Sequence, residues 1–156
     1  WYTFSTYFQN MIWGHKTQAL FDIWTFQHLL TGIFLSLVIH HIIIWKTKSP
    51  NIRVNKIFYN VFQKFDILTV LFFAYSWELL EYYFELGLFG SRIAYWFAGS
   101  EFWVNRFLFD PFIVLGGYIL GKKYKNITIP ATTLCVIWII VSVFFFPHSM
   151  WLHEIL

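Results

Sequence analysis

The sequence predicts an all-α integral membrane protein: a bundle of four transmembrane helices with an interfacial N-terminal segment. Of its 156 residues, 58% are hydrophobic, 24% are aromatic and only 12% are charged, which is roughly half the charged share of soluble domains. Eight of the eleven lysines and arginines fall in two short stretches between apolar segments. These basic residues are typical of membrane-protein loops, so they indicate no nucleic-acid partner. The single cysteine, Cys135, excludes a disulfide-stabilised scaffold.

Four segments are long and apolar enough to cross a bilayer, which takes about 20 helical residues. The predicted helices are residues 23–45, 66–85, 102–121 and 129–146. Pro130 suits the first turn of the last helix, and Pro147 ends it. The aromatic but interrupted stretch 1–20 is interpreted as an interfacial segment or as the tail of a preceding helix. Because no repeat or low-complexity linker divides the chain, we expect one domain over residues 1–156.

The basic residues also predict how the bundle is oriented. The two basic loops contain Lys46, Lys48, Arg53, Lys56, Lys64, Lys122, Lys123 and Lys125. The other side has Lys16 and Arg92 in loops, with Arg106 just inside the third helix. Since cytoplasmic loops of membrane proteins are enriched in lysine and arginine, both basic loops are expected in the cytoplasm. Both ends of the sequence are then extracytoplasmic.

Ionisable residues gather in the outer half of the first three predicted helices. His28 lies near the start of the first helix, Glu78 and Glu81 lie one turn apart in the second, and Asp110 lies in the third. A rise of 1.5 Å per residue puts these groups roughly 5 to 13 Å below the outer surface. Charged groups at such depth are costly and normally face the interior of a bundle or a wet cavity. We therefore expect these four residues to form one polar site.

Two kinds of chemistry fit this set of residues. A mixed imidazole and carboxylate shell suits zinc, iron or manganese, so the first hypothesis is a divalent metal held by His28, Glu78, Glu81 and Asp110. The second is a carboxylate acid–base pair tuned by burial. The sequence has no Ser-His-Asp order and no zinc-hydrolase motif, and it therefore assigns no reaction.

Other polar residues near the predicted site have structural interpretations. Arg106 and Asp110 are four residues apart and can neutralise each other. Asp22 is placed to cap the first helix. Three further charged residues are expected to be solvated loop or interface residues: Glu85, Arg92 and Glu101.

The third predicted helix has two features that affect its shape. Pro111 cannot donate to the carbonyl four residues back, so it frees an acceptor and is expected to bend the helix beside Asp110. Gly117 and Gly121 form a small-xxx-small pair, which permits close helix packing and carries no chemistry.

Several short motifs in this order resemble a known family. They are Trp13-x-His15, Asp22-Ile-Trp-Thr-Phe-Gln-His28, Trp77-Glu78-x-x-Glu81, and Asn105 with Asp110 ahead of Gly117. Their order and spacing resemble an uncharacterised family of small bacterial inner-membrane proteins, similar in layout to VanZ-like proteins. The resemblance covers residues 13–121 and implies a location in the bacterial inner membrane, but no reaction. Thr31 stands where the family tends to have a second histidine.

Three functions are compatible with these features. The first is a site-bearing membrane protein that binds or processes an amphiphilic or envelope-derived ligand from the outer side. The second is an accessory subunit of a larger respiratory, photosynthetic or oxygenase complex, with the polar cluster as a structural hydrogen-bond network. Transport is the weakest of the three, because the polar residues crowd one half of the bundle instead of its midplane. The expected partners are the lipid bilayer and other membrane proteins.

Overall fold

The computed structural model describes residues 11–47 and 52–155, and over these residues the chain is all-helical. The four long helices are α2 (Trp24–Thr47), α3 (Ile52–Glu85), α5 (Asp110–Lys123) and α6 (Thr128–Phe145). The short elements are α4 (Ser91–Trp96), the π-helix η1 (Asn105–Phe109), the 3-10 turn η2 (Lys125–Ile127) and α7 (Trp151–Ile155). The prediction of an all-α fold is confirmed.

The helix bounds agree with the sequence prediction except in the second and third helices. α2 and α6 begin and end within two residues of the predicted positions. α3 begins at Ile52 instead of residue 66, because residues 52–65 mix charged with apolar side chains and still suit a helix. The predicted third helix is divided into η1 and α5 just before Pro111. The predicted interfacial segment is described only from residue 11, since residues 1–10 lie outside the described part.

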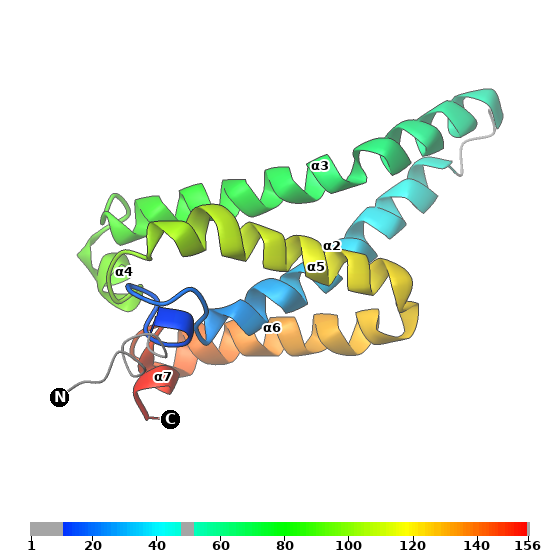
Figure 1. The fold of residues 1–156 in the computed structure, drawn as a ribbon. Coiled ribbons are helices and arrows are strands. Elements are labelled where there is room, and N and C mark those ends of the chain that lie inside the picture. The colour runs from blue at the N-terminus through cyan, green and yellow to red at the C-terminus, as the bar shows by residue number, and fades with distance from the viewer. Residues whose placement is uncertain (1–10, 48–51, 156) are drawn as a thin grey trace.

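α2 packs against α5, α6 and α3, and its most extensive contact is with α5. The end of α2 and the start of α3 lie at the same end of the bundle as the α5–α6 connection (Figure 1). α4, α7 and the loop of residues 11–22 lie together at the other end (Figure 1). Two helical stretches in the described part are long and apolar enough to cross a membrane. They are Trp24–Ile42, with mean hydropathy 1.3, and Lys125–Phe145, with mean hydropathy 2.3.

Glycines allow α2 and α5 to approach closely. A Cβ atom on Gly117 would lie 2.1 Å from the carbonyl oxygen of Leu29, and one on Gly32 would lie 2.0 Å from the α5 backbone. A Cβ on Gly121 would lie 2.2 Å from the Ser36 hydroxyl. Such distances leave no room for any side chain. The close packing predicted for Gly117 and Gly121 is confirmed, and its partner surface on α2 contains Gly32 and Ser36.

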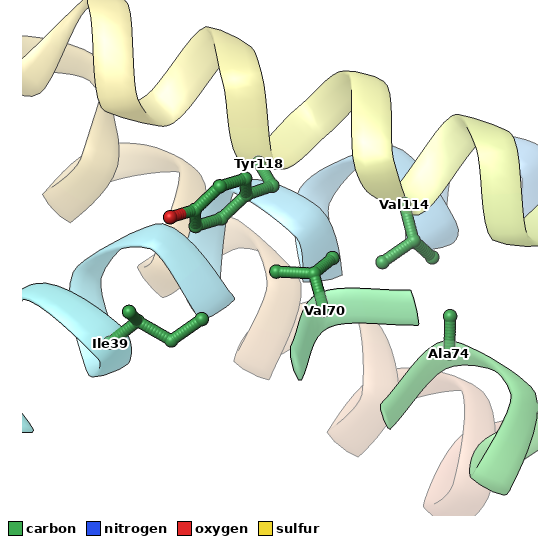
Figure 2. Close-up of a cluster of buried hydrophobic side chains, with 5 residues drawn as sticks. All are labelled: Ile39, Val70, Ala74, Val114 and Tyr118. Atoms are coloured by element: carbon green, nitrogen blue, oxygen red, sulfur yellow. The ribbon is translucent and has the colours of Figure 1, made fainter. Parts of the chain in front are cut away.

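A hydrophobic cluster in the bundle separates two groups of polar residues. Its buried members come from α2, α3 and α5 and are Ile39, Val70, Ala74, Val114 and Tyr118 (Figure 2). Toward the basic end, the Tyr118 hydroxyl donates to Asp66 at 2.8 Å, and Lys122 forms an ion pair with the same carboxylate. The second polar group, toward the other end, contains His28, Glu78 and Asp110.

Besides this hydrophobic cluster, the bundle buries many polar side chains, and it exposes large apolar ones. Its buried side chains include Gln27, Asn105 and Arg106. The side chains that face outward include Phe72 and Phe144, which are 68% and 78% exposed. A soluble protein rarely exposes large contiguous apolar surfaces, whereas polar groups of a membrane bundle turn toward its interior.

Pro111 leaves a backbone carbonyl free, as expected from the sequence, while the bend expected beside Asp110 stays a prediction. The carbonyl four residues back belongs to Phe107, and Pro111 has no N–H to donate to it. The hydroxyl of Tyr75 on α3 donates to this carbonyl at 3.0 Å. The π-helical turn η1 directly precedes Pro111, as is common where a helix is interrupted near a functional site.

We expect Tyr75→Phe to destabilise the fold by about 0.6 kcal/mol, and by no more than about 1.7 kcal/mol, the range for hydrogen bonds between membrane helices. The substitution removes the donor to Phe107 and keeps the aromatic ring. Tyr83→Phe is the matched control, because Tyr83 is a similarly exposed residue of the same helix. Unfolding of the purified variants in mixed micelles measures the difference. Equal stability of the two variants would show that the Tyr75 bond contributes nothing.

Candidate metal centre

Three of the four residues predicted to form the site meet inside the bundle. His28 comes from the second turn of α2, Glu78 from the last third of α3, and Asp110 from the first turn of α5. One ligand atom from each lies within 4.8 Å of the others. His28 Nε2 is 3.3 Å from Asp110 Oδ2, and His28 Nδ1 is 3.9 Å from Glu78 Oε1. All three residues are buried.

The glycine contact explains how α2 and α5 bring two of these residues together. His28 lies one turn before Gly32 on α2, and Asp110 lies two turns before Gly117 on α5. Since Gly32 and Gly117 hold the two backbones in contact, the side chains one and two turns away project into the same narrow space. α3 closes this space from the third side with Glu78.

Several buried oxygen atoms at this centre have no hydrogen-bond donor among the described residues. They are both carboxylate oxygens of Glu78 and Oδ1 of Asp110; Oε2 of Glu78 lies 3.9 Å from Nε of Arg106, in ion-pair range. Most buried polar atoms in proteins have a partner, and an uncompensated buried charge is costly. A cation held between the carboxylates and the His28 imidazole satisfies these acceptors, so the residues present fit a divalent metal.

Glu81 does not join this group, contrary to the sequence prediction. Its Oε1 lies 3.6 Å from Nζ of Lys16. The structure therefore leaves His28, Glu78 and Asp110 as the candidate ligands. Glu81 lies one turn farther along α3, where the loop of residues 11–22 covers the helix and supplies the lysine.

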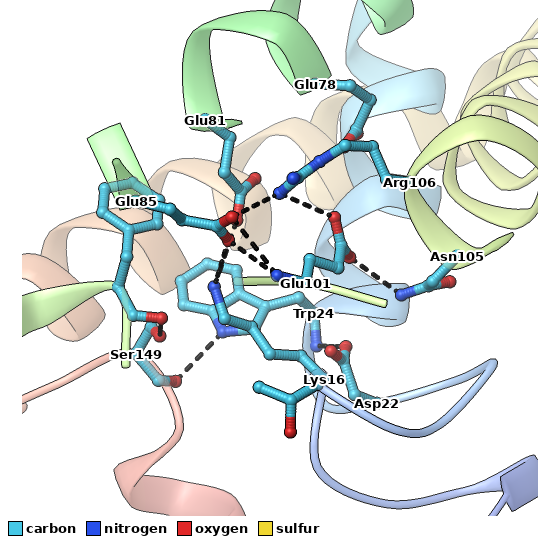
Figure 3. Close-up of polar contacts among 12 residues, drawn as sticks. Lys16, Asp22, Trp24, Glu78, Glu81, Glu85, Glu101, Asn105, Arg106 and Ser149 are labelled. Carbon is cyan, nitrogen blue, oxygen red and sulfur yellow. Dashed lines mark hydrogen bonds and ion pairs between the residues drawn. The ribbon is translucent and has the colours of Figure 1, made fainter. Parts of the chain in front are cut away.

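Lys16 belongs to a buried ion-pair network next to the centre (Figure 3). Its Nζ is 2.7 Å from Glu85 Oε1, and the other oxygen of Glu85 is 2.8 Å from Nη2 of Arg106. Arg106 Nη2 also lies 3.3 Å from Glu101 Oε2. Asn105 donates to the other Glu101 oxygen at 2.8 Å. These contacts connect residues 11–22 to the last residue of α3 and to the start of η1.

This network corrects two interpretations made from the sequence. The side chains of Glu85 and Glu101 are 0% and 5% exposed, so the solvated role expected for them is wrong. They are buried because the loop of residues 11–22 folds over the end of the bundle. Arg106 contacts these two carboxylates, and it does not form the expected pair with Asp110. Arg92 is exposed, as expected.

The cluster contains more acids than bases. Its carboxylates are Asp22, Glu78, Glu81, Glu85, Glu101 and Asp110, and its permanent cations are Lys16 and Arg106. Protons or a bound cation must balance the remaining negative charge. Burial, together with the nearby Glu81 and Asp110 carboxylates, raises the pKa of Glu101 to about 10. The raised pKa favours the protonated form of Glu101, and the carboxylates of Glu78 and Asp110 remain to be balanced.

Asp22 caps α2, as the sequence predicted. Its Oδ1 accepts hydrogen bonds from the backbone N–H groups of Trp24 and Thr25, at 2.7 and 3.2 Å. Its Oδ2 is buried and has no hydrogen-bond partner among the described residues. Burial raises the pKa of this carboxyl, and the bond from Trp24 opposes the shift.

The raised pKa of Asp22 predicts a pH dependence of stability. Above the unfolded-state value near 3.8, the folded protein keeps a proton that the unfolded chain loses. The stabilisation from Asp22 is therefore full at lower pH and declines as the pH rises toward the folded-state pKa. Asp22→Asn keeps a capping side chain and should remove this part of the pH dependence, whereas Asp22→Ala should cost about 1 kcal/mol through loss of the cap. Unfolding free energies measured between pH 4 and 7 check both, and an unchanged pH profile in Asp22→Asn would contradict the assignment.

Comparison of the chain with protein-family models, with curated proteins and with solved structures found no match. The resemblance to VanZ-like proteins stays a prediction.

Proposed function

We propose that this chain is a small integral membrane protein with four transmembrane helices, which binds one divalent metal ion through His28, Glu78 and Asp110. The observation that carries the proposal is the convergence of three buried ligand groups from three helices, within 4.8 Å of one another. The carboxylate oxygens of Glu78, which have no hydrogen-bond donor among the described residues, support it further. One imidazole with two carboxylates suits zinc, manganese or iron.

Three protein ligands leave a coordination position for water or for a ligand, as in catalytic metal sites. We propose that this position takes the polar group of an amphiphilic or envelope-derived ligand. The centre lies in the half of the bundle away from the basic connections. A ligand anchored in the outer leaflet can therefore bring its polar group to the metal while its apolar part stays in lipid.

The proposed membrane location is supported by the distribution of side chains, because polar groups are buried and large apolar groups are exposed. α2 and α6 contain the two stretches apolar enough to span a bilayer. α3 and α5 have lower mean hydropathy because they carry the ionisable residues of the centre and of the basic end. Their outward side chains are nevertheless large and apolar, and include Phe72, Phe73, Phe112 and Ile119.

Topology mapping tests whether the third helix of the proposed four-span arrangement crosses the membrane, and in which direction. Cys135 is the only cysteine, so Cys135→Ser provides a background for single reporters at Ser100 and Lys125. We expect a membrane-impermeant thiol reagent to label the cysteine at 100 from outside intact cells, and the cysteine at 125 only after permeabilisation. Labelling of both from one side would overturn the arrangement, and the reverse pattern would overturn its orientation.

Elemental analysis tests the metal centre. We expect protein purified in mild detergent to retain about one divalent metal ion per chain after dialysis against metal-free buffer. A sample that binds no zinc, manganese or iron, even after reconstitution with each, would overturn the metal assignment. The topology result does not depend on this outcome.

A subunit role in a larger complex is the second candidate. The observation that favours it is the α2–α3 pair, which extends beyond α5 and α6 at the basic end (Figure 1). In the described part of the chain, no other helix covers this extension. Native mass measurement after mild extraction tests the candidate: a stable assembly with other chains supports it, and a monomer or a homo-oligomer contradicts it.

A further inference from the structure

A second group of potential metal ligands lies at the same end of the molecule, nearer its surface. His15 comes from the loop of residues 11–22, His148 from the α6–α7 connection, and His153 and Glu154 from α7. The rings of His15 and His153 are 6.2 Å apart between centroids and form an angle of 72°. His148 Nε2 lies 3.4 Å from Glu154 Oε2. Three imidazoles and a carboxylate thus come from separate parts of the chain.

Two of these side chains, His148 and Glu154, border a hollow of about 300 Å³. Its lining residues are Ala94, Tyr95, Ala98, Gly99, His148 and Glu154. Figure 1 shows α7 beside α4 and the loop of residues 11–22 at this end. The hollow gives solvent access, in contrast to the buried centre of His28, Glu78 and Asp110.

The α6–α7 connection that carries His148 is fixed in place. The Ser149 backbone N–H donates to the Trp96 carbonyl at 2.7 Å, and its hydroxyl donates to the Phe97 carbonyl at 3.0 Å. The indole N–H of Trp24 donates to the Ser149 carbonyl at 3.0 Å (Figure 3). A ligand set on such an anchored segment loses little conformational entropy when it binds an ion.

The contacts of two histidines define the surroundings of their ring nitrogens. His15 Nδ1 lies 3.0 Å from the Thr17 hydroxyl, which orients the ring, and Nε2 is the atom we expect to bind an ion. His148 Nδ1 is buried and has no hydrogen-bond partner among the described residues.

We propose that His15, His148, His153 and Glu154 form a second, solvent-facing site for a zinc-like transition metal ion. Two imidazoles that share a zinc ion have ring centres roughly 5 to 6 Å apart, which follows from Zn–N distances of about 2.0 to 2.1 Å. The 6.2 Å separation of His15 and His153 is just outside this range, and the side chains must move for three ligand atoms to reach one ion. The Glu154 side chain is 51% exposed and can turn toward the ion.

The two sites differ in ligand chemistry. The surface site is rich in imidazole and suits zinc, copper or nickel, whereas carboxylates dominate the buried centre and also suit manganese or iron. The surface site shares no residue with the buried centre. It therefore does not depend on the function proposed above.

Zinc titration of the full chain in detergent, after removal of metal with a chelator, tests the proposal. We expect the wild type to bind one more zinc ion than the double variant His148→Ala/His153→Ala, with affinity at the remaining site unchanged. His40→Ala/His41→Ala is the matched control, because these two histidines are exposed at the opposite end of α2. It should bind the same number of zinc ions as the wild type.

Two results would overturn the proposal. One is an unchanged zinc stoichiometry in His148→Ala/His153→Ala. The other is an equal loss in the His40→Ala/His41→Ala control, which would indicate non-specific binding by exposed histidines. Circular dichroism melting of each variant establishes that it is folded before titration. Failure of the buried centre would appear separately. In that case the His148→Ala/His153→Ala variant would lose its zinc ion, and Glu78→Gln would bind as many zinc ions as the wild type.

Discussion

Glu78→Gln is expected to remove the metal ion from the buried centre, whereas Glu81→Gln is expected to leave it bound. The two glutamates lie one turn apart on α3 and receive the same change. Glu78 is 2% exposed and lies with His28 and Asp110, while Glu81 contacts Lys16 at 3.6 Å. Because losing a group that merely orients a ligand already weakens metal binding by 10- to 100-fold, we expect about 100-fold or more for Glu78→Gln. Competition with a chelating dye measures the affinity.

Stability gives an independent measure of the same substitution. Without metal, Glu78 is a buried carboxylate that lacks hydrogen-bond donors and lies 3.9 Å from Nε of Arg106, so the effect of metal is measured against the metal-free stability of each variant. With metal at 100 times its dissociation constant, the wild type should gain about 2.7 kcal/mol, and Glu78→Gln should gain little. If metal stabilises Glu78→Gln as much as it stabilises the wild type, Glu78 is not a ligand.

Gly117→Ala is expected to disrupt the packing of α2 against α5, and Gly116→Ala is not. The new Cβ on Gly117 would lie 2.1 Å from the Leu29 carbonyl oxygen, while a Cβ on Gly116 would have nothing within 4 Å. Overpacking of this kind costs about 1 to 3 kcal/mol or more, and a backbone atom cannot move aside as a side chain can. Gly116→Ala should be neutral or stabilising by up to about 1 kcal/mol, because alanine is the better helix former.

Unfolding in mixed micelles compares the two glycine variants. Gly117→Ala should also bind metal more weakly, because the Gly32–Gly117 contact sets the distance between His28 and Asp110. A Gly117→Ala protein with wild-type stability and metal affinity would show that this contact does not position the centre.

The sequence was sufficient to predict the four long helices, except the start of α3, and the convergence of His28, Glu78 and Asp110. The helices follow from runs of apolar residues long enough to span a bilayer, and the role of Gly117 follows from its four-residue spacing to Gly121. His28, Glu78 and Asp110 were identified because ionisable residues deep in apolar helices need a partner. Each of these inferences uses only local sequence and helix geometry.

The sequence did not reveal the role of the loop of residues 11–22. Lys16 is 2% exposed and pairs with Glu85, although 69 residues separate them and no periodic pattern connects a loop lysine with a helix end. The same missing contact made Glu85 and Glu101 look solvated and left Glu81 among the metal ligands. One feature of the sequence did point to buried ion pairs here, because acidic residues outnumber basic residues at this end of the bundle.

X-ray absorption spectroscopy of the metal-loaded protein tests the buried centre most directly. The His148→Ala/His153→Ala protein is the suitable sample, since it lacks two of the three histidines proposed for the second site. We predict one imidazole nitrogen in a shell otherwise made of oxygen atoms, and loss of the imidazole signal when His28→Gln is added. A shell without imidazole, or an imidazole signal that survives His28→Gln, would contradict the centre formed by His28, Glu78 and Asp110.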